Sequence, residues 1–263
     1  RSLCDWSSDV CSSDLTVLGT EFTTVPGGKG ANQAVAAARL GGPTTMVGRV
    51  GDDGFGPLLC NSLQLAGVAT ELVLADSGPS GVALINVDEW GDNQIVVVPG
   101  ANGRVDMTDV ARLPLEKAAN KTSILLMQFE IPLTAVKAAA ARAAEHCVIV
   151  DPAPARTDLP SEVFGLVDIL TPNQTEASQL TGLTVSSVAT AMEAAQALRQ
   201  RGTSTVIVKL GNQGVVVASK TEVFHVPAFE VAVVDTVAAG DAFNGGLAVA
   251  LWEGKSLRAS VTW

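Results

Sequence analysis

The strongest chemical signal in the sequence is the segment DTVAAGDAFNGGLAVAL, residues 235–251. An apolar run before it, FEVAVVD, predicts a strand, and a helix is expected to start near Gly240 or Asp241. Three small residues leave their backbone amides accessible: Ala238, Ala239 and Gly240. Those amides, reinforced by the helix dipole, would form an anion hole. Asp241 would lie beside this hole, although an aspartate there could also be a simple helix cap.

A carboxylate next to an anion hole is suited to phosphoryl transfer. It can accept the proton of a substrate hydroxyl while the hole stabilises charge on the transferred group. A cap alone would require neither the small residues before it nor Gly245 and Gly246 after it, since glycine is costly inside a helix unless something packs closely. The sequence contains no GxxxxGK[ST] loop and no protein-kinase signature set, so it predicts neither of those enzyme classes.

A second candidate site is the glycine-rich segment GGKGANQA, residues 27–34, which precedes an expected helix over 31–41. Its glycines let backbone amides approach a ligand, and the first N–H groups of the helix add further donors. Lys29 and Asn32 supply donors suited to hydroxyl groups. On its own this segment is ambiguous, because glycine-rich turns before helices are common.

The surrounding pattern predicts an α/β protein with a three-layer α/β/α core. Apolar, β-branched runs alternate with Ala- and Leu-rich segments of helical period, which is typical of a mainly parallel sheet covered on both faces. Strands are predicted over 44–51, 123–130, 147–154, 166–173, 204–211 and 214–219, and further helices over 132–146 and 186–202. The first of these helices places Val136, Ala140 and Ala143 on one face. The second has Ser186 or Ser187 as a cap and Gly202 as a stop.

One stretch breaks this alternation. Residues 80–102 predict two strands around a polar turn at 89–92, and residues 16–26 predict more β-structure. We therefore expect a small antiparallel β lid, formed by 16–26 and 79–99, on a core formed by 27–78 and 100–263.

Four of the predicted strands end in polar or glycine-bearing tips, at Glu130, Asp151, Asn173 and 211–214. Each tip alone could be ordinary turn chemistry. Ligands of open α/β sheets bind outside the carboxyl ends of the strands. The series therefore favours a polar site at that edge.

The composition narrows the function classes. The 263 residues carry a formal net charge of −10, which argues against broad binding to nucleic acid or anionic membranes. No apolar run is long enough to span a membrane. The four cysteines, Cys4, Cys11, Cys60 and Cys147, have no metal-ligand spacing, so reduced thiols in a cytoplasmic protein are expected.

Two long motifs carry a family resemblance. GGKGANQAVAAARLGG followed by VGRVGDDGFG, together with residues 235–251, resembles the two signatures of the ribokinase-like, or PfkB, carbohydrate kinases. LLMQFE, DPAPAR, TPNQTEASQLTG and the AAGD form of the turn resemble the ribokinase branch. The resemblance runs from about residue 16 to the end of the chain and implies the ribokinase-like fold.

This resemblance implies ATP-dependent phosphorylation of D-ribose at its 5-hydroxyl, with Mg²⁺ and a monovalent cation such as K⁺. Deoxyribokinase, fructokinase or another sugar or nucleoside kinase is the alternative within the family, because one altered hydroxyl contact can change the preferred sugar. It also implies a homodimer formed through the β lid, which on closing would exclude water from the sugar.

The resemblance also assigns roles residue by residue. Asp241 matches the catalytic base, and Ala238, Ala239 and Gly240 match the anion hole. The matched sugar-binding positions are Gly28, Lys29, Gly30, Asn32, Glu130 and Asp241 itself. The matched ATP-binding positions are Asn173, Lys209, Gly211, Asn212, Gly214 and Gly240. Glu176 matches a water-mediated Mg²⁺ position, and Asp235 with the Val237 carbonyl matches part of the monovalent-cation site.

The two ends depart from the family pattern. Residues 1–15, RSLCDWSSDVCSSDL, lack the apolar region of a signal peptide and any helical period. They could form a disordered tail, but reverse translation of 5–15 resembles a sequencing-library adapter, so we expect a non-native segment. In the family a strand with a sugar-binding Asn/Asp pair precedes residue 16, and a further segment follows residue 263. We therefore expect this 263-residue chain to be catalytically impaired, or to be a fragment that binds sugar or nucleotide without catalysis.

Overall fold

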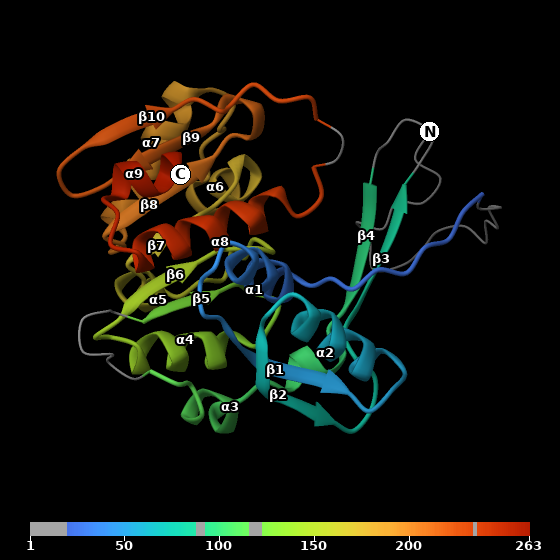
Figure 1. Cartoon of the computed structure of the whole chain (residues 1–263). Helices are drawn as coiled ribbons and strands as arrows, with labels where there is room; N and C mark the ends of the chain where they lie inside the picture. Colours follow the sequence, from blue (N-terminus) through green and yellow to red (C-terminus); the bar gives the residue numbers. More distant parts are fainter. Residues whose placement is uncertain (1–19, 88–92, 116–122, 234–235) are drawn as a thin grey trace.

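A computed structural model of the chain describes residues 20–87, 93–115, 123–233 and 236–263 (Figure 1). Its centre is a six-stranded sheet in the order β10-β9-β8-β7-β6-β5. The strands are β5 (Ile124–Met127), β6 (Cys147–Val150), β7 (Ile169–Leu170), β8 (Thr205–Lys209), β9 (Val215–Ala218) and β10 (Val223–Val226). β5 to β8 run parallel, while β9 and β10 are antiparallel to their neighbours.

Helices cover both faces of this sheet, which confirms the predicted three layers. Successive residues of β6 alternate between two apolar clusters, Val148 and Val150 in one and Ile149 in the other. The first cluster packs against α4 (Leu133–Arg142), α5 (Ser161–Gly165), α6 (Gln174–Thr181) and α7 (Val188–Gln200). The second packs against α8 (Ala239–Trp252) and α9 (Leu257–Thr262). α1 (Lys29–Arg39) lies alongside α8 (Figure 1).

Local signals explain the helix ends. Ser187 caps α7 by accepting a hydrogen bond from the Thr190 N–H, at 3.2 Å. The predicted core face of α4 is confirmed, since Val136, Ala140 and Ala143 are almost fully buried. Gly202, expected to stop α7, has a φ of 129°, a conformation that favours glycine.

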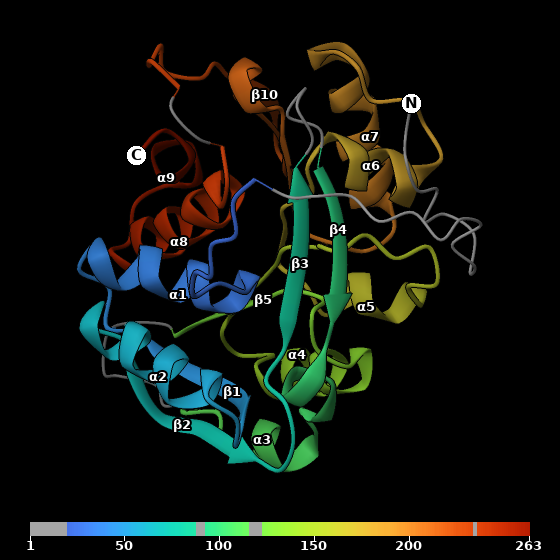
Figure 2. The ribbon, with the colours of Figure 1, turned by 90° about the vertical axis from the view of Figure 1, so that its right-hand side faces the viewer.

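The strand predicted over 44–51 does not join the large sheet. It forms β1 (Thr45–Gly51), which among the described strands pairs, in parallel, only with β2 (Ala69–Asp76). This pair packs with α2 (Phe55–Leu65), while η1 (Gly100–Arg104) and α3 (Met107–Ala111) lie beside it (Figure 2).

A large cavity of about 2580 Å³ lies between β1 and β5. Both strands line it with consecutive residues, 45–50 and 123–128. Because consecutive side chains of a strand point to opposite faces, a cavity that contacts all of them runs along the strand edges. The two sheets therefore face each other across the cavity through edges that no described strand pairs with.

The predicted hairpin is present as β3 (Val82–Val87) and β4 (Asn93–Val98), which pair antiparallel and stand away from the core (Figure 1). Its predicted turn, at 89–92, lies outside the described residues. The prediction of further β-structure over 16–26 is wrong for the described residues 21–26, which form no strand and are exposed. Residues 16–19 lie outside the described part.

The strand predicted over 229–235 is also wrong for the described residues 229–233. Phe229, Val231 and Val233 are exposed, at 72%, 71% and 67%. In both corrected segments the apolar pattern suits a strand, but no described strand pairs with the backbone, and the residues are exposed.

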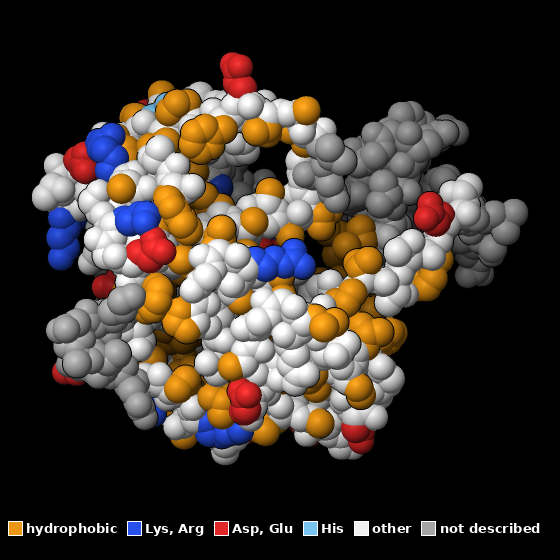
Figure 3. Space-filling view, viewed as in Figure 1, with side chains coloured by type: hydrophobic (Ala, Val, Ile, Leu, Met, Phe, Trp, Pro, Cys, Tyr) orange, Lys and Arg blue, Asp and Glu red, His pale blue; other side chains and the backbone are white. Residues whose placement is uncertain are grey.

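The surface and the thiols agree with the composition. On the face shown in Figure 3, Lys and Arg side chains are interspersed with Asp and Glu. None of the described helices is both long enough and apolar enough to cross a membrane. Cys60 and Cys147 are free thiols, and Cys4 and Cys11 lie outside the described residues.

Candidate active site

The site is built where α1 meets α8. Gly245 of α8 lies so close to α1 that a Cβ there would be 2.7 Å from the Ala36 Cβ and 2.8 Å from the Gln33 carbonyl oxygen. Such a spacing is too short for any side chain, so glycine is required at this crossing. The close approach brings the side chains of α1 within reach of the first turn of α8.

The carboxylate of Asp241 is held by two amides from α1. Asn32 Nδ2 donates to Asp241 Oδ2 at 3.1 Å, and Gln33 Nε2 donates to Asp241 Oδ1 at 3.0 Å. The Asp241 side chain is buried, with 5% exposure. A buried carboxylate fixed through both oxygens has a defined orientation, which a general base requires.

A second buried carboxylate, Asp151, lies at the end of β6. Gln33 Nε2 also donates to Asp151 Oδ2 at 3.2 Å, so one amide bridges two aspartates. Lys209, the last residue of β8, pairs with the other oxygen, Nζ to Oδ1 at 3.0 Å. Burial raises the pKa of Asp151, and the Lys209 ammonium opposes that rise. A connected polar chain thus runs from Lys209 through Asp151 and Gln33 to Asp241.

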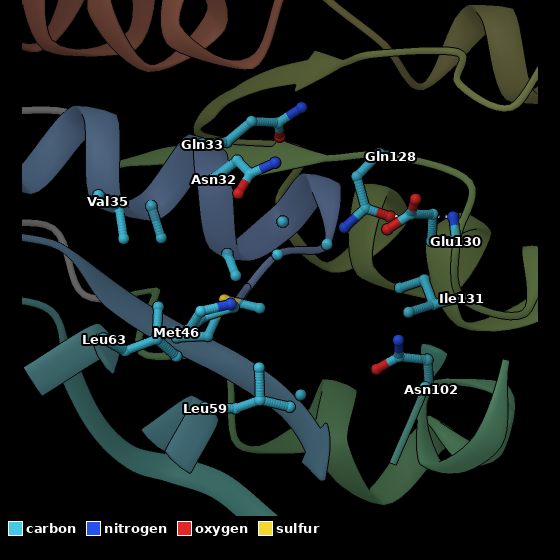
Figure 4. A pocket seen from close by; sticks show the side chains of 18 of the residues that line it. Asn32, Gln33, Val35, Met46, Leu59, Leu63, Asn102, Gln128, Glu130 and Ile131 are labelled. Carbon is cyan, nitrogen blue, oxygen red and sulfur yellow. Dashed lines mark hydrogen bonds between the residues drawn. The ribbon is translucent and has the colours of Figure 1, made fainter. Parts of the chain in front are cut away.

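The glycine-rich segment faces Glu130. The Lys29 N–H donates to Glu130 Oε2 at 2.9 Å, and Gly28 has a φ of 96°, which favours glycine. Gly30 leaves room for Gln128, because a Cβ on Gly30 would lie 2.6 Å from Gln128 Nε2. Gln128 in turn accepts a hydrogen bond from the Glu130 N–H at 3.0 Å, shown as the dashed line in Figure 4.

Glu130 and Asn32 come from different elements but line the same cavity (Figure 4). Burial raises the pKa of Glu130, the hydrogen bond from Lys29 lowers it, and the nearby Asp241 and Asp151 raise it further. This part of the cavity therefore presents the amides of Asn32 and Gln128 and the carboxylate of Glu130, a donor and acceptor set suited to the hydroxyls of a sugar.

Asn173 and Glu176 form a reciprocal cap at the start of α6. The Glu176 N–H donates to Asn173 Oδ1 at 2.8 Å, while Asn173 N and Nδ2 donate to the two Glu176 oxygens at 2.7 and 2.9 Å. Burial raises the pKa of Glu176. Asn173 also forms a bridge with Lys209, whose N–H donates to the Pro172 carbonyl at 2.8 Å.

These contacts determine which side chains are available to bind a metal ion. Among the residues the structure describes, no three His, Cys, Asp or Glu side chains are grouped to hold a metal. Glu176 is a single buried carboxylate beside the Asp151–Lys209 pair. That donor set fits Mg²⁺ held largely by water and phosphate oxygens, the usual arrangement for this ion, rather than a protein cage.

The first turn of α8 shows how the anion hole is built. Ala238 precedes the helix in a left-handed conformation, with a φ of 59°. The Ala239 N–H donates to the Thr236 carbonyl at 3.2 Å. This amide was predicted to be part of the anion hole, but its hydrogen bond to Thr236 means that it is not free to bind a ligand. The N–H groups of Gly240 and Asp241, also in the first turn, have no partner carbonyl within the helix.

The remaining predicted positions are placed as follows. Gly211 and Gly214 flank Asn212 in a short turn after β8 and take φ values of 58° and 87°. Val237 is exposed beside the cavity. Asp235 lies outside the described residues.

Sequence reasoning gave no role to four buried polar residues of the site. Gln33 follows Asn32 directly in the glycine-rich motif, and Asp151 was one of the strand tips, so the signal for both was present. Gln128 and Asn244 lie within otherwise apolar segments, and the sequence contained no signal that they belong to the site. Asn244, fully buried one turn after Asp241, has no hydrogen-bond partner for either side-chain polar atom, and Gln33 Oε1 has none either.

Comparison with known proteins decides the family. The family model described as pfkB family carbohydrate kinase matches residues 4–263. The chain belongs to this family. A ribokinase from Bacillus subtilis is 41% identical over 99% of this chain and 89% of its own length. A deoxyribokinase from Salmonella typhi is 36% identical over 92% of this chain and 80% of its own length.

Among solved structures, the ribokinase-like fold is matched closely. The Arabidopsis thaliana ribokinase complexed with ribose and ATP has a TM-score of 0.84 and 32% identity, covering 95% of this chain and 82% of that one. The predicted fold class and family are therefore confirmed.

Proposed function

We propose that this protein phosphorylates D-ribose at its 5-hydroxyl with ATP, giving ribose 5-phosphate and ADP. The observation that carries the proposal is Asp241, a buried carboxylate in the first turn of α8, held by Asn32 and Gln33 and adjacent to backbone amides. The similarity to ribokinases supports ribose as the sugar.

In this proposal the two halves of the site have separate tasks. Asp241 removes the proton from the 5-hydroxyl, whose oxygen attacks the γ-phosphorus. Asn32, Glu130 and the glycine-rich segment bind the sugar hydroxyls, while the first turn of α8 stabilises charge on the transferred group. Asn32 contacts Asp241 Oδ2, so Oδ2 is the oxygen on the sugar side and Gln33 holds Oδ1.

ATP would occupy the opposite side, along the carboxyl ends of β7 and β8. Asn173, Lys209 and the turn at 211–214 would contact it, and Glu176 would orient Mg²⁺ through water. When bound, Mg²⁺ would neutralise phosphate charge. We further propose a monovalent cation near Asp235 and the Val237 carbonyl, a homodimer formed through β3 and β4, and a cytoplasmic location, which the free thiols support.

The substrate is tested by ATP consumption, measured as ADP release across D-ribose, 2-deoxyribose, fructose and nucleosides. The proposal predicts the highest kcat/KM for ribose. A higher value for 2-deoxyribose would instead favour the activity named for the Salmonella typhi relative.

One observation favours a second candidate, binding of sugar and nucleotide without efficient turnover. The cavity of about 2580 Å³ between β1 and β5 adjoins the proposed sugar site, and within the described part of the chain no strand pairs with the edges of β1 and β5 that face it. A site open on that side would exclude water poorly, and water competes with the sugar as acceptor. Ribose and ATP binding by calorimetry, with no ribose-dependent ADP release, would establish this alternative.

A further inference from the structure

The ammonium of Lys209 lies directly at the start of α8. A Cβ placed on Gly240 would lie 3.4 Å from Lys209 Nζ, with the Lys209 Cε at 3.8 Å. The Lys209 side chain is largely buried, with 12% exposure, and among the residues that the structure describes its ammonium pairs with Asp151, itself 2% exposed. The ammonium is therefore fixed between the end of β8 and the first turn of α8.

This placement is electrostatically unfavourable without a ligand. The N-terminus of a helix carries a partial positive charge, so a cation next to it is repelled. Asp151 compensates only in part, because its other oxygen accepts from Gln33 and both side chains are buried. An anion that contacts the Gly240 N–H would relieve the repulsion and bind strongly, since a charged donor and a helix N-terminus would act on it together.

We propose that Lys209 is a catalytic residue that contacts the γ-phosphoryl group of ATP, and that Asp151 is the positioning residue that holds it there. This inference rests on the proposed kinase function. In the step, the substrate oxygen bonds to the γ-phosphorus, the bond from that phosphorus to the β–γ bridging oxygen breaks, and ADP leaves. The proton passes to Asp241. Lys209 transfers nothing and stabilises charge on the γ-phosphoryl oxygens throughout.

Four variants separate this role from simple neutralisation of Asp151. Lys209→Met removes the charge, Lys209→Arg retains it, and Lys209→Met combined with Asp151→Asn removes both charges of the pair. Lys220→Met, an exposed lysine between β9 and β10, is the matched control. Calorimetry with Mg-ATP and with Mg-ADP measures binding on the full chain and needs no turnover, so it remains informative if ribose is not the substrate. The value of kcat is measured in parallel.

Lys209→Met should weaken ATP binding about tenfold or more, as expected for a lost hydrogen bond to a charged group, and ADP binding less than about twofold. The double variant should bind ATP as weakly as Lys209→Met, Lys209→Arg should keep most of the preference for ATP, and Lys220→Met should match the parent. Restoration of ATP affinity in the double variant would overturn the proposal, since Lys209 would then serve only to neutralise Asp151. Equal loss of ATP and ADP affinity would overturn the γ-phosphoryl contact.

Discussion

At the scale of single residues, the site is a set of buried polar groups whose orientations depend on one another. Gln33 is the central member because one amide nitrogen bridges Asp241 and Asp151 at 3.0 and 3.2 Å. Without it, two buried carboxylates would lose a shared donor, and Asp241 would keep only the hydrogen bond from Asn32.

The first prediction concerns this bridge. Gln33→Met keeps the length of the side chain but removes the amide, so kcat for ribose phosphorylation should fall roughly tenfold, the value of one lost hydrogen bond. KM for ribose should change less than about threefold, because Asn32 and Glu130 are retained. Steady-state kinetics check this, with Gln200→Met, an exposed glutamine at the end of α7, as control. An unchanged kcat would show that Gln33 contributes only to packing and that its amide does not orient Asp241 for catalysis.

The second prediction concerns the pH dependence of stability. Burial raises the pKa of Glu130, so the ionised form is disfavoured in the folded state. Its contribution to stability is lost as pH rises from its unfolded pKa through its folded pKa. Glu130→Gln should therefore raise Tm at pH 7–8, and the gain should shrink as pH falls toward 5. Calorimetric scans at several pH values check this, with Glu162→Gln, an exposed glutamate of α5, controlling for the lost charge. A gain that grows toward low pH would contradict it.

At the scale of elements, catalysis depends on how closely α1 and α8 approach. The amides of Asn32 and Gln33 come from one helix and the base from the other, so any widening of the crossing separates them. Gly245 and Gly246 are adjacent on α8 and allow a matched comparison, because only Gly245 faces α1 at a distance shorter than van der Waals contact. A Cβ on Gly246 would instead lie an ordinary 3.6 Å from the Leu40 Cδ1.

The third prediction uses this pair. Gly245→Ala should destabilise the fold by about 1–3 kcal/mol through overpacking and should lower kcat as well. Gly246→Ala should be neutral or stabilise by about 0.5–1 kcal/mol, because glycine is a poor helix residue. Urea unfolding and steady-state kinetics measure both effects. Equal effects of the two substitutions would show that the crossing is not tight.

Elements were predictable where local sequence determines them. The apolar runs of β5, β6 and β8, the buried face of α4 and the Ser187 cap followed from period and capping. The strand predictions for residues 21–26 and 229–233 were wrong, because a high β-propensity does not by itself provide a neighbouring strand to pair with. The bridge through Gln33 joins segments over a hundred residues apart. The separation of β1 from the large sheet likewise depends on contacts between segments that are distant in the sequence. Local pattern does not contain such contacts, so sequence reasoning predicted Asp241 and Asn32 as site residues but not the amide that orients the base.

At the scale of the whole molecule, the hairpin of β3 and β4 carries a group of exposed apolar side chains. Ile85 and Ile95 are cross-strand partners, at 53% and 56% exposure, and Leu84 and Val97 are similarly exposed. Apolar side chains gathered on a projecting hairpin are typical of an interface. They support the proposed homodimer.

The fourth prediction tests that interface. Ile95→Glu places a charge in the middle of the hairpin and should convert a dimer to a monomer in analytical ultracentrifugation. Leu65→Glu, on the exposed end of α2 at 81% exposure, should leave the mass unchanged. A parent chain that sediments as a monomer at micromolar concentration would contradict dimer formation through the hairpin.

The central claim is that Asp241 is the base in ATP-dependent phosphorylation of ribose. Asp241→Asn keeps the shape of the side chain and removes its basicity, so kcat should fall by about 10²–10⁴, the usual contribution of a general base. The Kd for ATP should remain within about threefold, because the nucleotide side of the site is unchanged. The decisive measurement is ribose-dependent ADP release by the two proteins, with ATP binding measured in parallel. The account predicts loss of turnover with retained binding, and near-normal turnover by the Asn variant would contradict it.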